Sequence, residues 1–218
     1  MRKPAVDYRK LRLHNLNAPQ FRHVWLLLGW AGYFLLYFLT ENLIPPGNCH
    51  VIHCPLDDRI PFCEGFAVFY VGWYFLLAGS LLWFLVYDPE SFKRLQTYII
   101  AVQLMATAVY VLYPSCQRLR PEVFPRVNFL TALMGVIYAI DTPTGVFPSL
   151  HVAISLGIAS TWLREKSVSR WVRGGIVWFC FMVVLSVSFV KQHSVLDILG
   201  AIPICLIAEW FAFWRKRG

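Results

Sequence analysis

Charged residues are scarce in this sequence. They make up 15% of the 218 residues, whereas 58% are hydrophobic and 17% are aromatic. A typical soluble domain carries about 25% charged residues, so this chain is too apolar for an ordinary soluble domain. The composition instead matches a protein that crosses a membrane several times.

Linkers, internal repeats and low-complexity tracts are also missing from the sequence. Because no stretch rich in glycine, serine or proline divides the chain, we predict a single membrane domain over residues 24–214. Basic segments flank it at residues 1–23 and 215–218. The first is expected to be a partly disordered cytoplasmic tail that lies against anionic headgroups. The apolar run after it has no small-residue cleavage site, which favours an uncleaved span.

Acidic residues are the rarer charged class. The chain has 12 Asp and Glu residues and 20 Lys and Arg residues, which gives a net charge of +8. Such an excess in a soluble protein could indicate nucleic-acid binding. Here the basic residues fall in the gaps between apolar runs, so membrane topology explains them and no nucleic-acid partner is expected.

Six apolar runs are predicted to cross the membrane as helices. A span needs about 20 apolar residues, and the fourth run is shorter than that. A further apolar stretch at residues 127–140 is too short to cross and predicts a re-entrant or interfacial helix. The predicted fold class is therefore all-α, a bundle of six transmembrane helices with a short helix before the fourth. The predicted spans are residues 24–44, 66–87, 95–113, 150–163, 174–190 and 195–214.

The basic residues also predict the orientation. Of the 20 lysines and arginines, 15 lie in the tail, the second and fourth loops and the C-terminal end, all on one side of a six-span arrangement. Basic residues favour the cytoplasmic side, so both termini are expected in the cytoplasm. The opposite loops then face the extracytoplasmic or lumenal side.

His193 and Asp197 stand where the last apolar run begins. Ionisable residues at such places in membrane proteins are usually functional. At a spacing of four residues they share one face of a helix, so the carboxylate can hold the imidazole in one tautomer. A second imidazole, His151, follows Ser149 at a predicted helix start. Together with an upstream guanidinium, Arg120, these groups indicate phosphate chemistry.

These residues form three motifs: Arg120-Pro121, Pro148-Ser149-x-His151 and Ser186-x6-His193-x3-Asp197. In order and spacing they resemble the signature of the type 2 phosphatidic acid phosphatase superfamily. Lys191-Gln192-His193 and the upstream Asp58-x-Ile60-Pro61-Phe62 look closest to its inositol phosphorylceramide synthase-like branch. The resemblance covers residues 57–209.

Three positions depart from that signature. Tyr113 stands where the first-motif lysine is usual, and Leu150 replaces the glycine of the second motif. Val187 replaces the arginine that usually follows the third-motif serine. Two phosphate-binding cations are thereby lost, and Lys191 is the candidate to replace one of them.

The chemistry of phosphate transfer assigns the roles, and the resemblance implies the same ones. His193, oriented by Asp197, attacks phosphorus to give a phosphohistidine. His151 is the general acid for the leaving alcohol and later activates water. No carboxylate cluster suggests a metal, so metal-independent catalysis without a cofactor is expected. The expected phosphate-binding residues are Arg120, Ser149, Leu150 through its backbone, Lys191 and Ser186.

Two of these signals have simpler interpretations. A lone hydroxyl such as that of Ser186 more often bonds its own helix backbone, and only the resemblance makes it a phosphate ligand. Lys191 could also be a lysine whose head reaches the membrane edge. Asp57 and Asp58 are expected in a solvated loop or a helix cap rather than at a headgroup.

The loop Cys49-His50-x2-His53-Cys54 has the composition of a metal site. Its spacing is not a common zinc pattern, and the loop is expected outside the cytoplasm, where disulfides form. Disulfides or free thiols are therefore favoured over a metal for the loop cysteines, which are Cys49, Cys54, Cys63 and Cys116.

The sequence thus predicts an integral membrane lipid phosphatase that hydrolyses a lipid phosphate or pyrophosphate. One alternative is transfer of a phospho-headgroup to an alcohol such as inositol. An inactive lipid-phosphate-binding membrane protein stays open because the two cations are missing. A transporter is disfavoured because no span combines Gly/Pro breaks with intramembrane charges.

Overall fold

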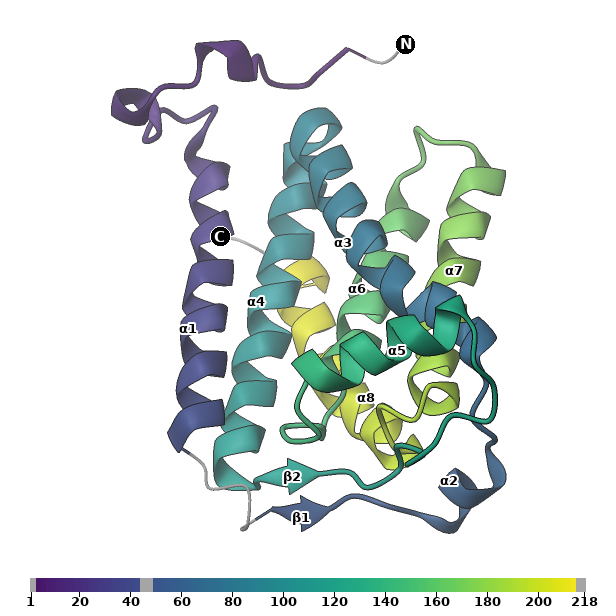
Figure 1. Cartoon of the computed structure of the whole chain (residues 1–218). Coiled ribbons are helices and arrows are strands. Elements are labelled where there is room, and N and C mark those ends of the chain that lie inside the picture. The colour runs from purple at the N-terminus through teal and green to yellow at the C-terminus, as the bar shows by residue number, and fades with distance from the viewer. Residues whose placement is uncertain (1–2, 44–48, 215–218) are drawn as a thin grey trace.

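The computed structural model describes residues 3–43 and 49–214, and eight α-helices make up most of this part of the chain (Figure 1). Two short strands, β1 (His50–Val51) and β2 (Ser115–Cys116), pair in parallel. The helices are α1 (Leu28–Leu43), α2 (Pro55–Arg59), α3 (Ala67–Tyr87), α4 (Pro89–Leu112), α5 (Phe129–Ile140), α6 (Leu150–Arg164), α7 (Arg170–Phe189) and α8 (Val195–Glu209). Short turns η1 (Tyr8–Lys10), η2 (Leu13–Asn15), η3 (Arg22–Leu27) and η5 (Glu64–Phe66) precede helices, and a π-helical turn, η6 (Trp210–Trp214), extends α8.

Four helical segments are long and apolar enough to cross a membrane. They are Glu64–Tyr87, Pro89–Leu112, Arg170–Phe189 and Val195–Trp214. The predicted mostly helical fold is confirmed, and the four candidate spans support a multi-pass membrane protein. The helices at the other two predicted spans are shorter than the roughly 20 residues of a typical span, with 16 residues in α1 and 15 in α6.

The short α6 lies in the middle of the bundle. It packs against α3, α4, α7 and α8, and Ala153 and Ile158 on it are completely buried. Gly157 lets α4 approach closely, because a Cβ at this position would collide with the ring of Tyr98. The hydroxyl of that tyrosine donates to the carbonyl of Ala153 at 3.1 Å. Because its neighbours cover it, α6 does not need the length of a lipid-facing helix.

Two helices begin earlier than their apolar patterns predict. α4 begins at Pro89 rather than at residue 95, because Asp88 caps it and proline is favoured in the first turn. Lys93 and Arg94 therefore lie on the helix rather than in a loop. α7 begins at Arg170 rather than at residue 174, with Ser169 as its cap.

The described part of the N-terminal tail is packed against the bundle, so the expectation of partial disorder is wrong for it. Phe21 and His23 are buried. The hydroxyl of Tyr8 bonds His23 Nε2 at 2.6 Å and the carbonyl of Leu85 at 2.7 Å. The tail therefore covers the end of the bundle where α3 turns into α4.

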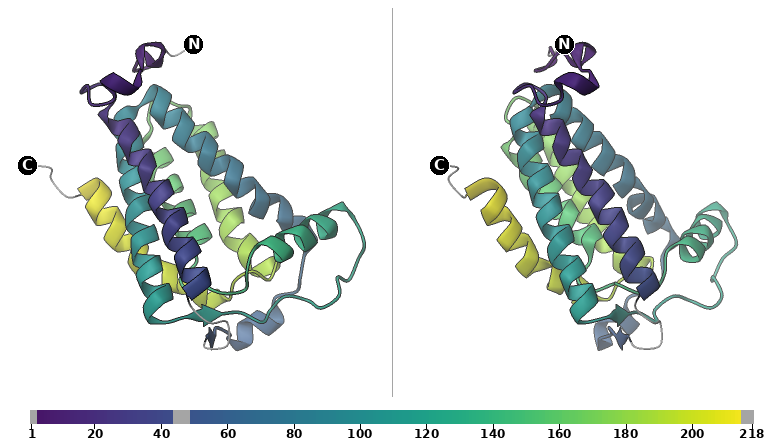
Figure 2. Two further views of the ribbon diagram at one scale, coloured as in Figure 1. Left: turned by 60° about the vertical axis from the view of Figure 1, so that its left-hand side comes forward. Right: turned by 90° about the vertical axis from the view of Figure 1, so that its left-hand side faces the viewer.

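The elements divide between the two ends of the bundle. The N-terminal turns and the α6–α7 loop lie at one end, whereas α2 and the two strands lie at the other (Figure 1). α5 stands off to one side of the bundle near this second end (Figure 2). A disulfide between Cys49 and Cys116 joins the segment before α2 to the segment after α4.

Candidate active site

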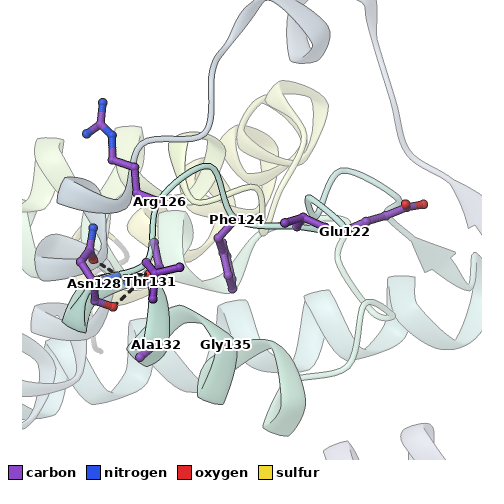
Figure 3. A pocket seen from close by; sticks show the side chains of 9 residues that line it. Glu122, Phe124, Arg126, Asn128, Thr131, Ala132 and Gly135 are labelled. Carbon is purple, nitrogen blue, oxygen red and sulfur yellow. Dashed lines mark hydrogen bonds between the residues drawn. The ribbon is translucent and has the colours of Figure 1, made fainter.

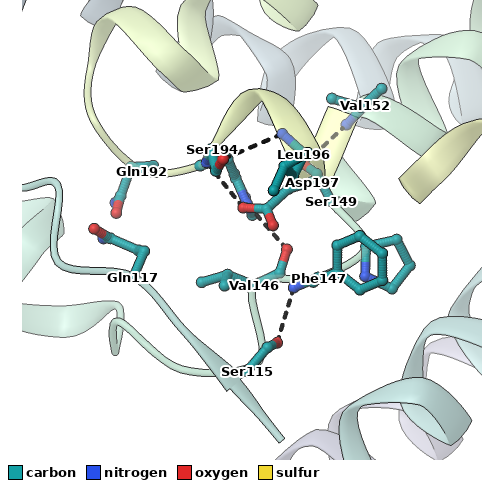
Figure 4. A network of polar contacts seen from close by, with 12 residues as sticks. Ser115, Gln117, Val146, Phe147, Ser149, Val152, Gln192, Ser194, Leu196 and Asp197 are labelled. Atoms are coloured by element: carbon teal, nitrogen blue, oxygen red, sulfur yellow. Dashed lines mark hydrogen bonds and ion pairs between the residues drawn. The ribbon is translucent and has the colours of Figure 1, made fainter. Parts of the chain in front are cut away.

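The second predicted motif forms the start of α6. Ser149 is the N-cap, and its hydroxyl accepts a long hydrogen bond from the backbone N–H of Val152 at 3.4 Å. The backbone N–H of Ser149 donates to the carbonyl of Asp197 at 3.1 Å, which ties this turn to α8 (Figure 4). Tyr110 holds the preceding loop by donating to the carbonyl of Pro148 at 2.8 Å. The second and third motifs of the expected site are thus built on adjoining helix ends.

The first turn of α6 offers backbone donors that have no acceptor within the helix. The opening N–H groups of a helix have no carbonyl of their own helix to bond, and they favour anions. Leu150 occupies the first of these positions, followed by His151. The phosphate contact expected of the Leu150 backbone stays a prediction.

The third motif forms the start of α8. Ser194 is the N-cap, and the Asp197 carboxylate accepts from its backbone N–H at 3.0 Å. His193 lies just before the cap rather than on the helix, so the two residues do not share a helix face as the sequence predicts. The two side chains still meet, because the capping carboxylate turns back over the residues that precede the helix.

The Nδ1 atom of His193 has two acceptors. It lies 3.1 Å from Asp197 Oδ2 and 3.1 Å from the carbonyl oxygen of Val146. In the neutral ring this arrangement favours a proton on Nδ1 and leaves Nε2 with its lone pair. Asp197 is fully buried, and its other oxygen, Oδ1, has no hydrogen-bond partner in the described part of the chain.

His151 lies beside His193, with 5.9 Å between the ring centroids. Its imidazole packs against three aromatic rings of α3, which are those of Tyr70, Trp73 and Tyr74. Its buried Nε2 has no hydrogen-bond partner among the described residues. The fold therefore brings together the two histidines and the carboxylate that the sequence singles out.

Arg120 reaches the loop that carries His193, but its donors are already engaged. Its N–H groups bond the side-chain oxygen of Gln192 and the backbone carbonyls of Tyr138, Asp141 and Thr142. Burial lowers the pKa of Arg120, and the neighbouring Asp141 opposes that shift. All five N–H donors of the guanidinium have acceptors in the protein, so contact with a phosphate would require exchanging some of them.

Lys191 points towards α2. Its Nζ donates to the carbonyl oxygen of Asp57 at 2.7 Å and, over a shorter distance, to that of Ile60. Burial lowers the pKa of Lys191, while Asp57 and Asp58 act in the opposite direction. An ammonium has three donors, so one remains for another acceptor. The phosphate-binding role expected of Lys191 stays a prediction.

Ser186 is fully buried in α7, and its hydroxyl donates to the carbonyl of Val183 at 2.7 Å. This is the backbone contact typical of a lone serine in a membrane helix. Two of the three positions that differ from the signature the sequence resembles have side chains engaged in packing. Val187 is fully buried, and the ring of Tyr113 stacks on that of His50 at 4.3 Å.

Asp57 has a structural role at the start of α8 that the sequence does not predict. It is 2% exposed and accepts hydrogen bonds from Ser194 Oγ at 2.6 Å and from the backbone N–H of Val195 at 2.8 Å. It also caps its own helix by accepting from the N–H of Cys54 at 2.8 Å. The cap interpretation was correct for α2, but the same carboxylate also holds the start of α8.

Two of the four loop cysteines form a disulfide, and the other two are free thiols. Cys49 bonds Cys116, whereas Cys54 and Cys63 are free. Within residues 3–43 and 49–214, no group of three His, Cys, Asp or Glu residues is arranged to hold a metal ion.

Comparison with known proteins adds no family to this description. No protein-family model, no curated protein and no solved structure matches the chain.

Proposed function

We propose that the chain is an integral membrane lipid phosphatase, similar to the type 2 phosphatidic acid phosphatases, which forms a phosphohistidine intermediate. The observation that carries this proposal is the arrangement of His193. Its Nδ1 is held by Asp197 and by the carbonyl of Val146, and its other nitrogen is left as a nucleophile beside a second imidazole. A positioned nucleophile with an oriented partner and a nearby acid is the pattern of covalent catalysis.

The reaction begins with attack of His193 Nε2 on phosphorus. The P–O bond to the lipid alcohol breaks as the N–P bond forms, and His151 delivers a proton to the leaving oxygen. Asp197 and Val146 stabilise the imidazolium character that develops on His193. The N–H groups at the start of α6, around Ser149 and Leu150, bind the phosphate oxygens. Water, activated by His151, then hydrolyses the N–P bond and releases phosphate.

The proposed membrane arrangement uses six helices: α1, α3, α4, α6, α7 and α8. The sequence excess of lysine and arginine at the end with the N-terminal turns supports a cytoplasmic location for that end. The two histidines then face the extracytoplasmic or lumenal side. α5 has 12 residues and is too short to cross, so we place it at the extracytoplasmic interface.

Rapid quenching with labelled lipid phosphate tests the mechanism. The parent should give an acid-labile phosphoenzyme, and His193→Ala should give none and should lose turnover. His151→Ala should be severely impaired but should still form some phosphoenzyme when the leaving group is activated. His14→Ala, an exposed histidine of the tail, is the matched control and should behave as the parent. Turnover near the parent rate in His193→Ala would contradict the proposed mechanism.

The same purified protein separates hydrolysis from the alternatives. A panel of lipid phosphates is supplied with and without an alcohol acceptor, in the presence of chelator. Release of free phosphate in both conditions supports a phosphatase. A new phosphodiester that forms only with the alcohol would identify a transferase, and binding without turnover of any substrate would identify an inactive binding protein.

A further inference from the structure

The outward side of α5 is entirely apolar. We call the exposed residues Phe129, Ala132, Val136, Ala139 and Ile140 the outer face of this helix. Phe129 is 79% exposed and Ile140 is 78% exposed. No residue from Phe129 to Ile140 carries a charge, so the helix has no face suited to bulk water.

The loop before α5 extends this surface. Val123 is 82% exposed and Val127 is fully exposed. Between this loop and α5 lies an open groove of about 410 Å³, lined mainly by Val123, Phe124 and Val127 and by Ala132 and Gly135 (Figure 3). Arg126 and Asn128 stand at its rim and both bond Glu64, which fixes the loop to the start of α3.

The position of this surface identifies what covers it. Exposed apolar patches of this kind mark contacts with a partner or a membrane. α5 lies beside a bundle that has four helices apolar enough to cross a bilayer, near the end that carries α2 and the strands (Figure 2). The N-terminal half of α3 also presents exposed apolar side chains, including Val68 and Phe75. A lipid leaflet that surrounds the bundle would therefore meet the groove and the outer face together.

The surface is also connected to the catalytic loop. The ring of Phe124 packs on that of Tyr138, whose hydroxyl donates to the carbonyl of Val190 at 2.6 Å. The Arg120 guanidinium lies 4.7 Å from the centre of the Tyr138 ring and bonds Gln192, the neighbour of His193. A short series of side-chain contacts thus joins the groove to the loop that carries His193.

We propose that the outer face of α5 and the adjoining groove bind the acyl chains of lipid in the extracytoplasmic leaflet. The bound chains include those of the substrate, so this surface selects long-chain lipid phosphates over short-chain ones. The selectivity rests on the proposed lipid phosphatase function, whereas the binding of acyl chains does not.

Fluorescence quenching tests the binding without an activity assay. Cys54 and Cys63 are replaced by serine, and a fluorophore is attached to a cysteine introduced at Val127 in protein held in phospholipid vesicles. Lipids brominated on their chains should quench this label strongly and should leave a label at Arg59, on α2, largely unaffected. Equal, weak quenching at both positions would overturn the proposal. So would a label at Val127 that is shielded from lipid by a second copy of the chain.

Paired substrates test the selectivity. Val127→Asp and Val136→Asp place a carboxylate where an acyl chain would lie, which is costly in apolar surroundings. We expect the ratio kcat/KM to fall at least about tenfold for a long-chain lipid phosphate in vesicles. It should change less than about twofold for a soluble short-chain analogue with the same headgroup. Val51→Asp, at an exposed valine of β1, is the matched control and should leave both ratios unchanged.

The two substrates keep the outcomes distinct. Normal turnover of the short-chain analogue shows that a variant is folded. Equal losses on both substrates, or no loss on either, would overturn the selectivity and leave the phosphatase standing. If the parent turns over neither substrate, the proposed function fails, and the quenching at Val127 alone decides the acyl-chain site.

Discussion

Lys191 has a backbone and side-chain geometry that fix the loop between α7 and α8, which carries His193. Its φ of 54° lies in the left-handed region that a side chain other than glycine rarely adopts. Its Nζ is bonded to the backbone carbonyls of Asp57 and Ile60 on the α2 segment. These bonds hold α2 against the loop between α7 and α8. Lys191 lies two residues before His193 in this loop. A third N–H remains available, so an anchoring role and a phosphate contact are compatible.

The first prediction at this scale concerns Lys191→Gln. Loss of the two carbonyl contacts should lower the free energy of unfolding by about 1–3 kcal/mol. Loss of the charge near phosphorus should lower kcat/KM by about 10²-fold or more, equivalent to roughly 3 kcal/mol. Lys191→Arg should recover part of the activity, because it keeps the charge with a different geometry. Thermal unfolding and steady-state kinetics on the same preparations measure both effects.

Lys166→Gln is the control for this variant, since Lys166 is an exposed lysine in the α6–α7 loop. It should match the parent in both measurements. A destabilised Lys191→Gln that keeps activity within a few-fold of the parent would make Lys191 an anchor only. Arg118 or Arg126 would then be the better candidate for the missing phosphate-binding cation.

At the scale of elements, α2 holds the start of α8 in place through hydrogen bonds. The Asp57 carboxylate accepts from Ser194 Oγ and from the N–H of Val195, while Lys191 bonds carbonyls of the same segment. The loop with His193 is therefore held from both sides by a helix of five residues. Because Asp57 touches no reacting atom, we regard it as a positioning residue.

The pKa of Asp57 leads to a prediction about stability and pH. Burial raises this pKa, but the hydrogen bonds from Ser194, Val195 and Cys54 outweigh burial and hold it below its ordinary value. The carboxylate therefore contributes stability above the pKa of the unfolded chain, about 4, and loses that contribution as the pH falls through its lower folded value. Asp57→Asn should be less stable than the parent by about 2 kcal/mol at pH 7. The difference should shrink below about pH 4.

Thermal unfolding of detergent-solubilised protein across this pH range measures the effect. Asp58→Asn is the matched control, because the neighbouring Asp58 is exposed and is bonded at the surface to His53. It should leave the curve close to that of the parent. Parallel curves for Asp57→Asn and the parent would show that the carboxylate contributes no charge-dependent stability.

Several elements follow from local sequence, and others do not. The approximate positions of the long helices follow from their apolar runs. The sequence also predicts the contact of His193 with Asp197, although the contact is made across the helix cap rather than along a helix face. The early start of α4 comes from Asp88 and Pro89, a capping signal that hydropathy alone overlooks. The bond between Asp57 and Ser194 joins residues 137 positions apart, so no local pattern reveals it. The packing of the N-terminal tail on the bundle could not be predicted either, because the contact of Tyr8 with Leu85 joins residues 77 positions apart.

At the scale of the whole molecule, charge and chemistry separate the two ends of the bundle. The N-terminal turns, the start of α4 and the α6–α7 loop with its flanking helix ends share one end and carry most of the described basic residues (Figure 1). The disulfide, α2 and the paired histidines occupy the other end. Disulfides persist in oxidising compartments, so the Cys49–Cys116 bond supports the same orientation as the basic residues.

Thiol labelling in intact cells tests this orientation. In a background with Cys54 and Cys63 replaced by serine, a cysteine at Lys166 should resist a membrane-impermeant reagent, whereas a cysteine at Glu122 should react. Both should react after the membrane is permeabilised, which shows that each thiol is accessible. Prior reduction should also make Cys49 reactive from outside, because it lies at the same end as Glu122 and is less buried than its partner Cys116. The reverse pattern would place the paired histidines in the cytoplasm, where a different pool of lipid phosphates would meet them.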